Sequence, residues 1–230
     1  RLSMWPSHAL LPSFCLAMAA LVSGCVSSAR LPASLPSGGG LGTGLVFGSI
    51  GISATAPTIE MSTLQFRALA GDPRQPPGEF VFHSPVGTAG RLLSPLFDTP
   101  VDFSEPDAKG TLFVARLPAG DYALVGAAVE NAPMHGWAAH VYLADPGAVP
   151  FRVDAGGTTY LGQFISHLRV GRDADRIPKV QGAFFVVGDK LERDLALLKQ
   201  RGERPLPPSV INLAPRLMQI DNEALRGGPP

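Results

Sequence analysis

The stretch TLFVARLPAGDYALVGAAV, residues Thr111–Val129, contains two short apolar runs separated by the turn Pro118–Gly120. Short apolar runs bounded by residues that favour turns are typical of β-strands. Proline fixes its own backbone and glycine permits tight turns, so Pro118 and Gly120 can redirect the chain between the two runs. The stretch therefore predicts two strands joined by a hairpin or a corner.

The same pattern recurs along much of the chain. Glycine (26) and proline (23) are abundant and charged residues make up only 17% of the 230 residues, which disfavours long helical bundles. Turn signals at intervals of about 8–12 residues favour a sandwich or a barrel over alternating strands and helices. We therefore predict a mainly β fold, an antiparallel β-sandwich over residues 45–188. Its other strands are expected at residues 45–53, 63–69, 79–83, 137–143, 150–155, 158–164 and 182–187.

One amphipathic helix is predicted at the C-terminal side of the sheets, over residues 189–202. Asp189 can cap its N-terminus and Glu192 can reach back, in a capping-box pattern with Asp in the first position. Three leucines at helical spacing form an apolar stripe that can dock on a sheet: Leu191, Leu195 and Leu198.

The last segment, residues 203–230, is rich in proline and carries no clear periodicity. We expect it to run extended along the domain. Its end, Arg226–Pro230, is expected to be disordered because chain termini without apolar anchors rarely order.

The N-terminal stretch ALLPSFCLAMAALV, Ala9–Val22, fits the apolar region of a signal peptide and is short for a membrane span. Val22-Ser23-Gly24-Cys25 follows directly, and this tetrapeptide resembles the lipobox of bacterial lipoproteins. The resemblance implies cleavage between Gly24 and Cys25, so that residues 1–24 are a signal peptide, and acylation of Cys25. An ordinary cleaved signal with a chance cysteine, or an unprocessed anchor, are the alternatives.

Two further expectations follow from the lipoprotein resemblance. Residue 26 is Val rather than Asp, which by the rule of that family implies delivery to the outer membrane, facing the periplasm. Residues 25–44, rich in Ser, Pro and Gly, then form the lipidated end and a flexible tether. No phosphate-binding glycine motif fits the tether, and no cofactor is predicted.

A second resemblance concerns the domain itself. The sequence RLPAGDYALVG, Arg116–Gly126, resembles the corner of carboxypeptidase-regulatory-like and transthyretin-like β-sandwich domains. FRVDAGGTTYLGQF, Phe151–Phe164, resembles the strand pair that follows in uncharacterised lipoproteins of that build. These resemblances imply an Ig-like or transthyretin-like sandwich in which the Tyr122 ring is buried and its hydroxyl bonds a nearby backbone group.

Chemistry-bearing residues are few and scattered. Lys plus Arg equals Asp plus Glu, at 19 each, without a basic run, so a nucleic-acid partner is not expected. His135 and His140 are weak candidates for a metal site because their spacing aligns on neither a helix face nor a strand face, and His83 or His167 would have to join them. The loop containing Met134, His135 and Trp137 is a possible binding loop.

Two classes of function remain open at this point. The first is a membrane-anchored envelope lipoprotein whose non-catalytic β-sandwich binds another envelope protein or acts structurally. The alternative is a hydrolase or metal-dependent enzyme with a site assembled from dispersed His and Asp/Glu residues. A carrier of a small apolar ligand is a third, smaller possibility, and the oligomeric state is open.

Overall fold

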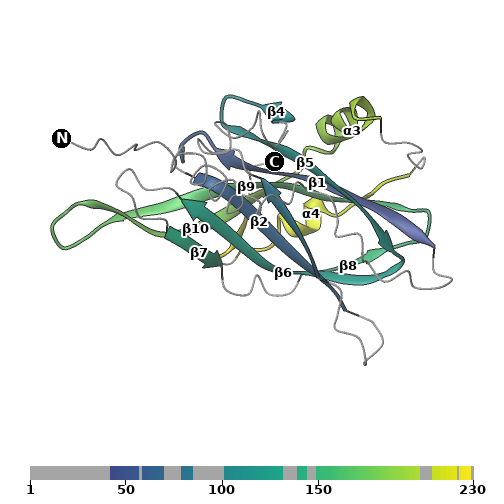
Figure 1. The fold of residues 1–230 in the computed structure, drawn as a ribbon, viewed down its shortest axis with the longest axis horizontal. Helices are drawn as coiled ribbons and strands as arrows, with labels where there is room; N and C mark the ends of the chain where they lie inside the picture. Colours follow the sequence, from purple (N-terminus) through teal and green to yellow (C-terminus); the bar gives the residue numbers. More distant parts are fainter. Residues whose placement is uncertain are drawn as a thin grey trace, which may run out of the picture.

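The structure is a computed structural model that describes residues 42–56, 59–69, 79–84, 101–131, 139–143, 149–202, 209–221 and 223–228. The fold is mainly β, with two sheets and few helices (Figure 1). The larger sheet has the strand order β12-β10-β9-β1-β5-β4, and β11 also pairs with β9. The smaller sheet has the order β3-β2-β6-β7, and β8 also pairs with β6.

The bounds of the elements are as follows. The larger sheet consists of β1 (Thr43–Ser53), β4 (Phe103–Ser104), β5 (Ala108–Pro118), β9 (Thr158–Arg172), β10 (Pro178–Gly188), β11 (Ile211–Asn212) and β12 (Leu225–Gly227). The smaller sheet consists of β2 (Ile59–Ala68), β3 (Glu79–Ser84), β6 (Gly120–Asn131), β7 (Ala139–Leu143) and β8 (Val149–Val153). Two helices are described, α3 (Leu191–Gln200) and α4 (Ala214–Leu217), and no described helix is long and apolar enough to cross a membrane.

The side chains of both sheets meet in one apolar core. Phe113 of the larger sheet stacks on Phe82 of the smaller sheet, with ring centroids 4.4 Å apart, and Phe66 lies 6.5 Å from the same Phe113 ring. All three phenylalanines are at most 2% exposed. Aromatic pairs of this kind add stabilisation beyond their buried area, so these rings hold the two sheets together.

The turn Pro118–Gly120 is a corner rather than a hairpin. Pro118 ends β5 in the larger sheet and Gly120 begins β6 in the smaller one. The ring of Tyr122 is buried, and its hydroxyl donates to the Pro118 carbonyl at 2.8 Å, as the resemblance to sandwich corners implied. This bond fixes the point at which the chain leaves one sheet for the other.

The expectation of purely antiparallel sheets is wrong for the larger sheet. β1 pairs antiparallel with β5 but parallel with β9, and β12 and β11 also pair in parallel with β10 and β9. Hairpins give antiparallel neighbours, but between β5 and β9 the chain runs through β6, β7 and β8 of the other sheet. β1 and β9 are therefore neighbours without being consecutive, and they run in the same direction.

The C-terminal prediction is also wrong in part. Residues 209–221 and 223–228 contain β11, the short helix α4 and β12 rather than forming a fully extended segment, and a proline in the first turn of α4 favours a helix start there. Arg226 and Gly227, expected to be disordered, pair with β10, and the Gly228 amide donates to the Val187 carbonyl at 2.7 Å. The segment orders because it satisfies the unpaired backbone groups on that edge of β10.

The expected boundaries of the tether and the helix shift slightly. Thr43 and Gly44, assigned to the tether, are the first residues of β1, and the signal peptide and residues 25–41 lie outside the described residues. α3 begins at Leu191, after Lys190, and the carboxylate of Asp189 accepts from the Leu191 amide at 3.1 Å. The N-cap residue is Lys190 rather than Asp189, and no described hydrogen bond joins Glu192 to Asp189, so the predicted capping box is wrong. The Asp189 carboxylate instead satisfies the amide of the first helical residue.

Candidate functional site

Most of the site residues predicted from sequence lie outside the described residues. These are Gly24, Cys25, Met134, His135 and Trp137. His140 lies in β7, in register with Glu130 of β6. The predictions of a lipidation site and of a binding loop therefore stay predictions.

The two other histidines lie on different sheets. His83 of β3 shares a hydrogen bond of 3.0 Å with the hydroxyl of Thr63, and burial lowers the His83 pKa while Glu130 partly opposes that shift. His167 of β9 stacks on Phe184 at 5.2 Å, and burial lowers its pKa also. Within the described residues no group of three His, Cys, Asp or Glu side chains could hold a metal ion.

A buried polar cluster, not foreseen from the sequence, lies between α3 and the larger sheet. Asp194 of α3 is fully buried and accepts four hydrogen bonds. One carboxylate oxygen accepts from Ser49 Oγ (2.7 Å) and Tyr160 OH (2.9 Å), and the other accepts from Arg193 Nε (2.9 Å) and Nη2 (2.7 Å). Arg193 also pairs with Glu105 at 2.7 Å.

A β-bulge in β9 aims two residues at this cluster. The pairing of β1 with β9 shifts between Phe47 and Ser49, so that Tyr160 and Gln163 both face α3 although they are three positions apart along the chain. Gly162, inside the bulge, has φ of 112°, which side chains of L-residues rarely adopt. Gln163 accepts from Arg193 Nη1 at 2.9 Å when its amide oxygen faces the guanidinium.

Burial and neighbouring charges shift the pKa values of Asp194, Tyr160 and Arg193 in this cluster. Burial raises the pKa of Asp194, although Arg193 and the hydroxyl donors oppose that shift. Burial, and then the charge of Asp194, raise the pKa of Tyr160 far above its usual range. Burial acts to lower the pKa of Arg193, but its pairing with Asp194 and Glu105 prevails and raises it.

The cluster can fasten α3 on the sheet, and nothing in its geometry presents a reactive group. Ser49, Tyr160 and Asp194 are each 0% exposed, and their polar atoms are used by one another. The guanidinium of Arg193 also lies 4.0 Å from the ring centroid of Phe103, which adds a cation–π contact. A hydrolytic nucleophile would need access to a substrate, and this serine has none.

A hollow of about 440 Å³, open to solvent, is the best candidate for a binding site. It lies at the end of the smaller sheet, beside α4, and is lined by Leu69, Asp121, Pro150, Phe151, Arg152 and Arg216. An apolar crevice of about 10 Å³ adjoins it, shares Pro150, Phe151 and Arg216 with it, and is also lined by core residues such as Leu124 and Leu217. A crevice of that size holds about one water molecule, so any ligand sits mainly in the hollow.

The hollow combines apolar walls with guanidinium groups at its rim. Leu69 is 53% exposed and adds an apolar side chain to the hollow. Arg152 pairs with Asp121 at 3.4 Å and with Asp154 at 3.2 Å, but both pairs are exposed and therefore weak. Arg216 is exposed and makes no side-chain hydrogen bond or ion pair among the described residues. The arrangement suits a ligand with an apolar group and an anionic group.

The hollow could not be predicted from the sequence, because its residues come from four separate segments and no motif joins them. Comparison of the chain with protein-family models, with curated proteins and with solved structures gives no match.

Proposed function

We propose that the chain is a lipid-anchored lipoprotein of the bacterial envelope, acylated at Cys25 and delivered to the outer membrane, where it faces the periplasm. The two sheets then form a β-sandwich of the transthyretin-like type that acts as a non-catalytic binding module. Its binding site is the hollow beside α4, and its ligand is an amphiphile with an apolar group and an anionic head. The observation that carries this proposal is the exposed apolar hollow with Arg216 beside it, an exposed arginine without an ion-pair partner among the residues that the structure describes.

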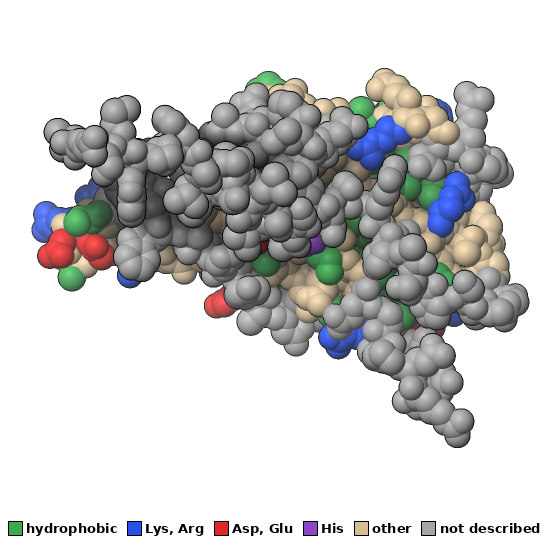
Figure 2. Space-filling view, in the orientation of Figure 1, with side chains coloured by type: hydrophobic (Ala, Val, Ile, Leu, Met, Phe, Trp, Pro, Cys, Tyr) green, Lys and Arg blue, Asp and Glu red, His purple; other side chains and the backbone are tan. Residues whose placement is uncertain are grey.

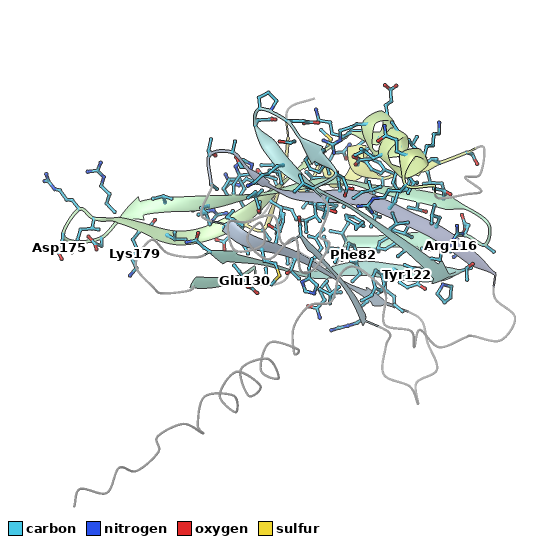
Figure 3. The ribbon with its side chains drawn as sticks, turned by 45° about the horizontal axis from the view of Figure 1, so that its top comes forward. Phe82, Arg116, Tyr122, Glu130, Asp175 and Lys179 are labelled. Carbon is cyan, nitrogen blue, oxygen red and sulfur yellow. The ribbon has the colours of Figure 1, made fainter. Side chains whose placement is uncertain are left out.

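The position of the hollow relative to the start of the domain supports the proposal. Gly42 accepts from the amide of Ala119, and Thr43 accepts from the amide of Gly156. Ala119 is two residues from Asp121, and Asp121 lines the hollow. The chain therefore enters the domain at the end that carries the hollow. Figure 3 labels Arg116 and Tyr122 at this end. Residues 26–42 as a flexible linker span about 20–25 Å on average, which keeps this end near the membrane.

The anchor is tested by the intact mass of the detergent-extracted protein, measured beside a Cys25→Ala variant, with fractionation of cells that express each. We expect a mature chain that begins at Cys25 and carries acyl chains, and a variant that lacks both the acyl mass and the membrane association. A soluble, unacylated wild-type product would overturn the anchor.

The site is tested by titration of the full chain with dansyl-labelled undecanoate, an apolar chain with one carboxylate. Loss and reversal of one guanidinium charge in Arg216→Glu should weaken binding about tenfold, because a charge-assisted contact becomes repulsive. Arg172→Glu, an exposed arginine at the other end of β9, is the matched control and should leave binding unchanged. Equal weakening by both substitutions would reject the hollow as the site.

The alternative, a hydrolase or metal-dependent enzyme, has no observation in its favour within the described residues. His83 and His167 lie on different sheets, and the one buried serine with a carboxylate partner is sealed beneath α3.

A further inference from the structure

The β9–β10 hairpin extends beyond the rest of the larger sheet as a two-stranded arm, here defined as residues 167–182. β9 pairs with β1 only as far as Ser166, and β12 pairs with β10 only at residues 185–187. Figure 1 shows the hairpin projecting at one end of the molecule. In Figure 3 its labelled residues Asp175 and Lys179 lie at the opposite end from Arg116 and Tyr122.

The tip of the arm is held in one shape. Asp173 accepts from the amides of Asp175 (3.0 Å) and Ile177 (2.9 Å) through one carboxylate oxygen. The Asp173 amide donates to the Ile177 carbonyl at 3.0 Å, which closes the loop. Arg176 takes the left-handed conformation that completes the turn, with φ of 64°. An isolated two-stranded hairpin is marginal in water, so these bonds preorganise the arm.

One edge of the arm is regular and open. The pairing of β9 with β10 shifts between Val180 and Gly182, which is a bulge at Gln181, and the Gln181 side chain lies against Gly171 of the facing strand. A bulge of this kind disturbs the regular backbone of its own strand, so that a further strand pairs less readily with the edge of β10. On β9, by contrast, no described strand pairs with the outer edge of residues 167–172, so their outward backbone groups can take a further strand.

The side chains of the arm combine exposed apolar groups with cations. Val170 is 61% exposed and Ile177 is 58% exposed, among the most exposed large apolar residues described. Residues 169–180 contain four cations and two carboxylates, a net charge of +2 in a chain whose net charge is zero. The exposed cations Arg172, Arg176 and Lys179 make no ion pair among the described residues. Figure 2 shows the apolar, basic and acidic side chains of this tip crowded together at one end of the molecule.

We infer that the arm is a docking element for an acidic, extended segment of a partner protein, which adds as a strand along residues 167–172 of β9. The open edge supplies backbone hydrogen bonds, as in recognition by strand addition. The cations select acidic side chains, and Val170 contacts an apolar side chain on the partner. A second copy of this chain is a poor occupant, because two arms with the same net positive charge repel each other.

Part of this inference rests on the proposed function. β9 has 15 residues, and at about 3.3 Å per residue its two ends are about 50 Å apart. Since the chain enters the domain near the start of β9, anchoring at Cys25 makes the arm point away from the membrane. The charge and the open edge of the arm do not depend on the anchor.

The test uses the full chain and a fluorescein-labelled peptide of alternating glutamate and valine, with an alternating lysine and valine peptide as the control. We expect saturable binding of the acidic peptide only, and slower amide hydrogen exchange in residues 167–172 without a matching change in β10. The double substitution Arg172→Glu and Lys179→Glu should weaken binding about tenfold or more. Arg216→Glu, at the other end of the molecule, should leave it unchanged. Lys179→Glu alone is the second variant if the double variant does not fold.

Different results would contradict different parts of the proposal for the arm. Equal binding of both peptides, or binding without protection of residues 167–172, would refute strand addition. Sedimentation showing dimers that the double substitution disrupts would assign the arm to self-association instead. Binding to phosphatidylglycerol vesicles that depends on the same two cations, with no peptide binding, would assign it to a lipid surface. An unacylated wild-type product in the Cys25 experiment, together with retained peptide binding, would reject the anchor and leave the arm standing.

Discussion

Replacing Asp194 by alanine should be among the most damaging single changes in this protein. The carboxylate is 0% exposed and accepts hydrogen bonds from Ser49, Tyr160 and Arg193. Without it, the hydroxyl hydrogens of Ser49 and Tyr160 lose their acceptor in a place that water does not reach. Arg193 keeps Glu105 as a partner, at 2.7 Å.

The size of the effect can be worked from these contacts. Each buried hydroxyl left without an acceptor costs about 1–3 kcal/mol, and breaking a buried ion pair from one side costs about 3–5 kcal/mol. Because Arg193 is only half-buried and retains Glu105, the lower part of that range applies. Together these costs come to about 5 kcal/mol or more, but removing the carboxylate also removes the free-energy cost of burying its charge. We therefore expect Asp194→Ala to lower the free energy of unfolding by about 3–4 kcal/mol, a large part of the 5–15 kcal/mol typical of a domain.

The assay is urea unfolding followed by circular dichroism, together with amide hydrogen exchange in α3. Exchange in α3 should accelerate in the variant because the helix loses its main polar attachment to β1 and β9. Glu192→Ala, an exposed position on the same turn, is the matched control and should cost less than about 0.5 kcal/mol. Equal costs for Asp194→Ala and Glu192→Ala would refute the view that the cluster fastens α3. A Tyr160→Phe and Asp194→Ala pair whose effects simply add would refute it too.

Two further predictions concern the smaller sheet. Tyr122→Phe keeps the buried ring but removes the 2.8 Å hydrogen bond to the Pro118 carbonyl. It should therefore lower the free energy of unfolding in urea by about 1–2 kcal/mol. A change near zero would contradict the role of that bond in the corner. Burial holds the His83 pKa below 6.5 in the folded state. The folded protein therefore binds fewer protons at His83 than the unfolded chain does when the pH is near or below 6.5. The contribution of His83 to the free energy of unfolding is thus present above pH 6.5 and is lost as the pH falls through the folded pKa. His83→Gln should therefore flatten the loss of stability between pH 7.5 and pH 5, and an unchanged pH profile would be evidence against the assignment.

The strands were predictable from sequence because alternation and turn residues report directly on local structure. Every described strand of five residues or more contains or overlaps a predicted run, and the corner at Pro118–Gly120 was one of two arrangements that the sequence allowed. The direction of β9 relative to β1 was not predictable, since it depends on how many times the chain crosses between sheets. β12 was missed for a related reason. Residues 225–227 carry little apolar pattern and are ordered by an edge of β10 that lies far from them along the chain.

The polar cluster beneath α3 shows why the site could not be found in the same way. From the sequence alone, Asp194 looks like one more charged residue on an amphipathic helix. The leucine stripe of that helix already explains why the helix packs on the sheet, and Leu198 is buried there. What makes Asp194 unusual is a bulge in a distant strand. Gly162 adds one residue to β9, and this turns both Tyr160 and Gln163 toward the helix. A carboxylate at position 194 is tolerated only because those donors and Arg193 face it. The presence of a carboxylate at position 194 thus depends on a register shift that cannot be known until the strands are paired. The hollow also depends on the tertiary arrangement, because residues from four segments meet there.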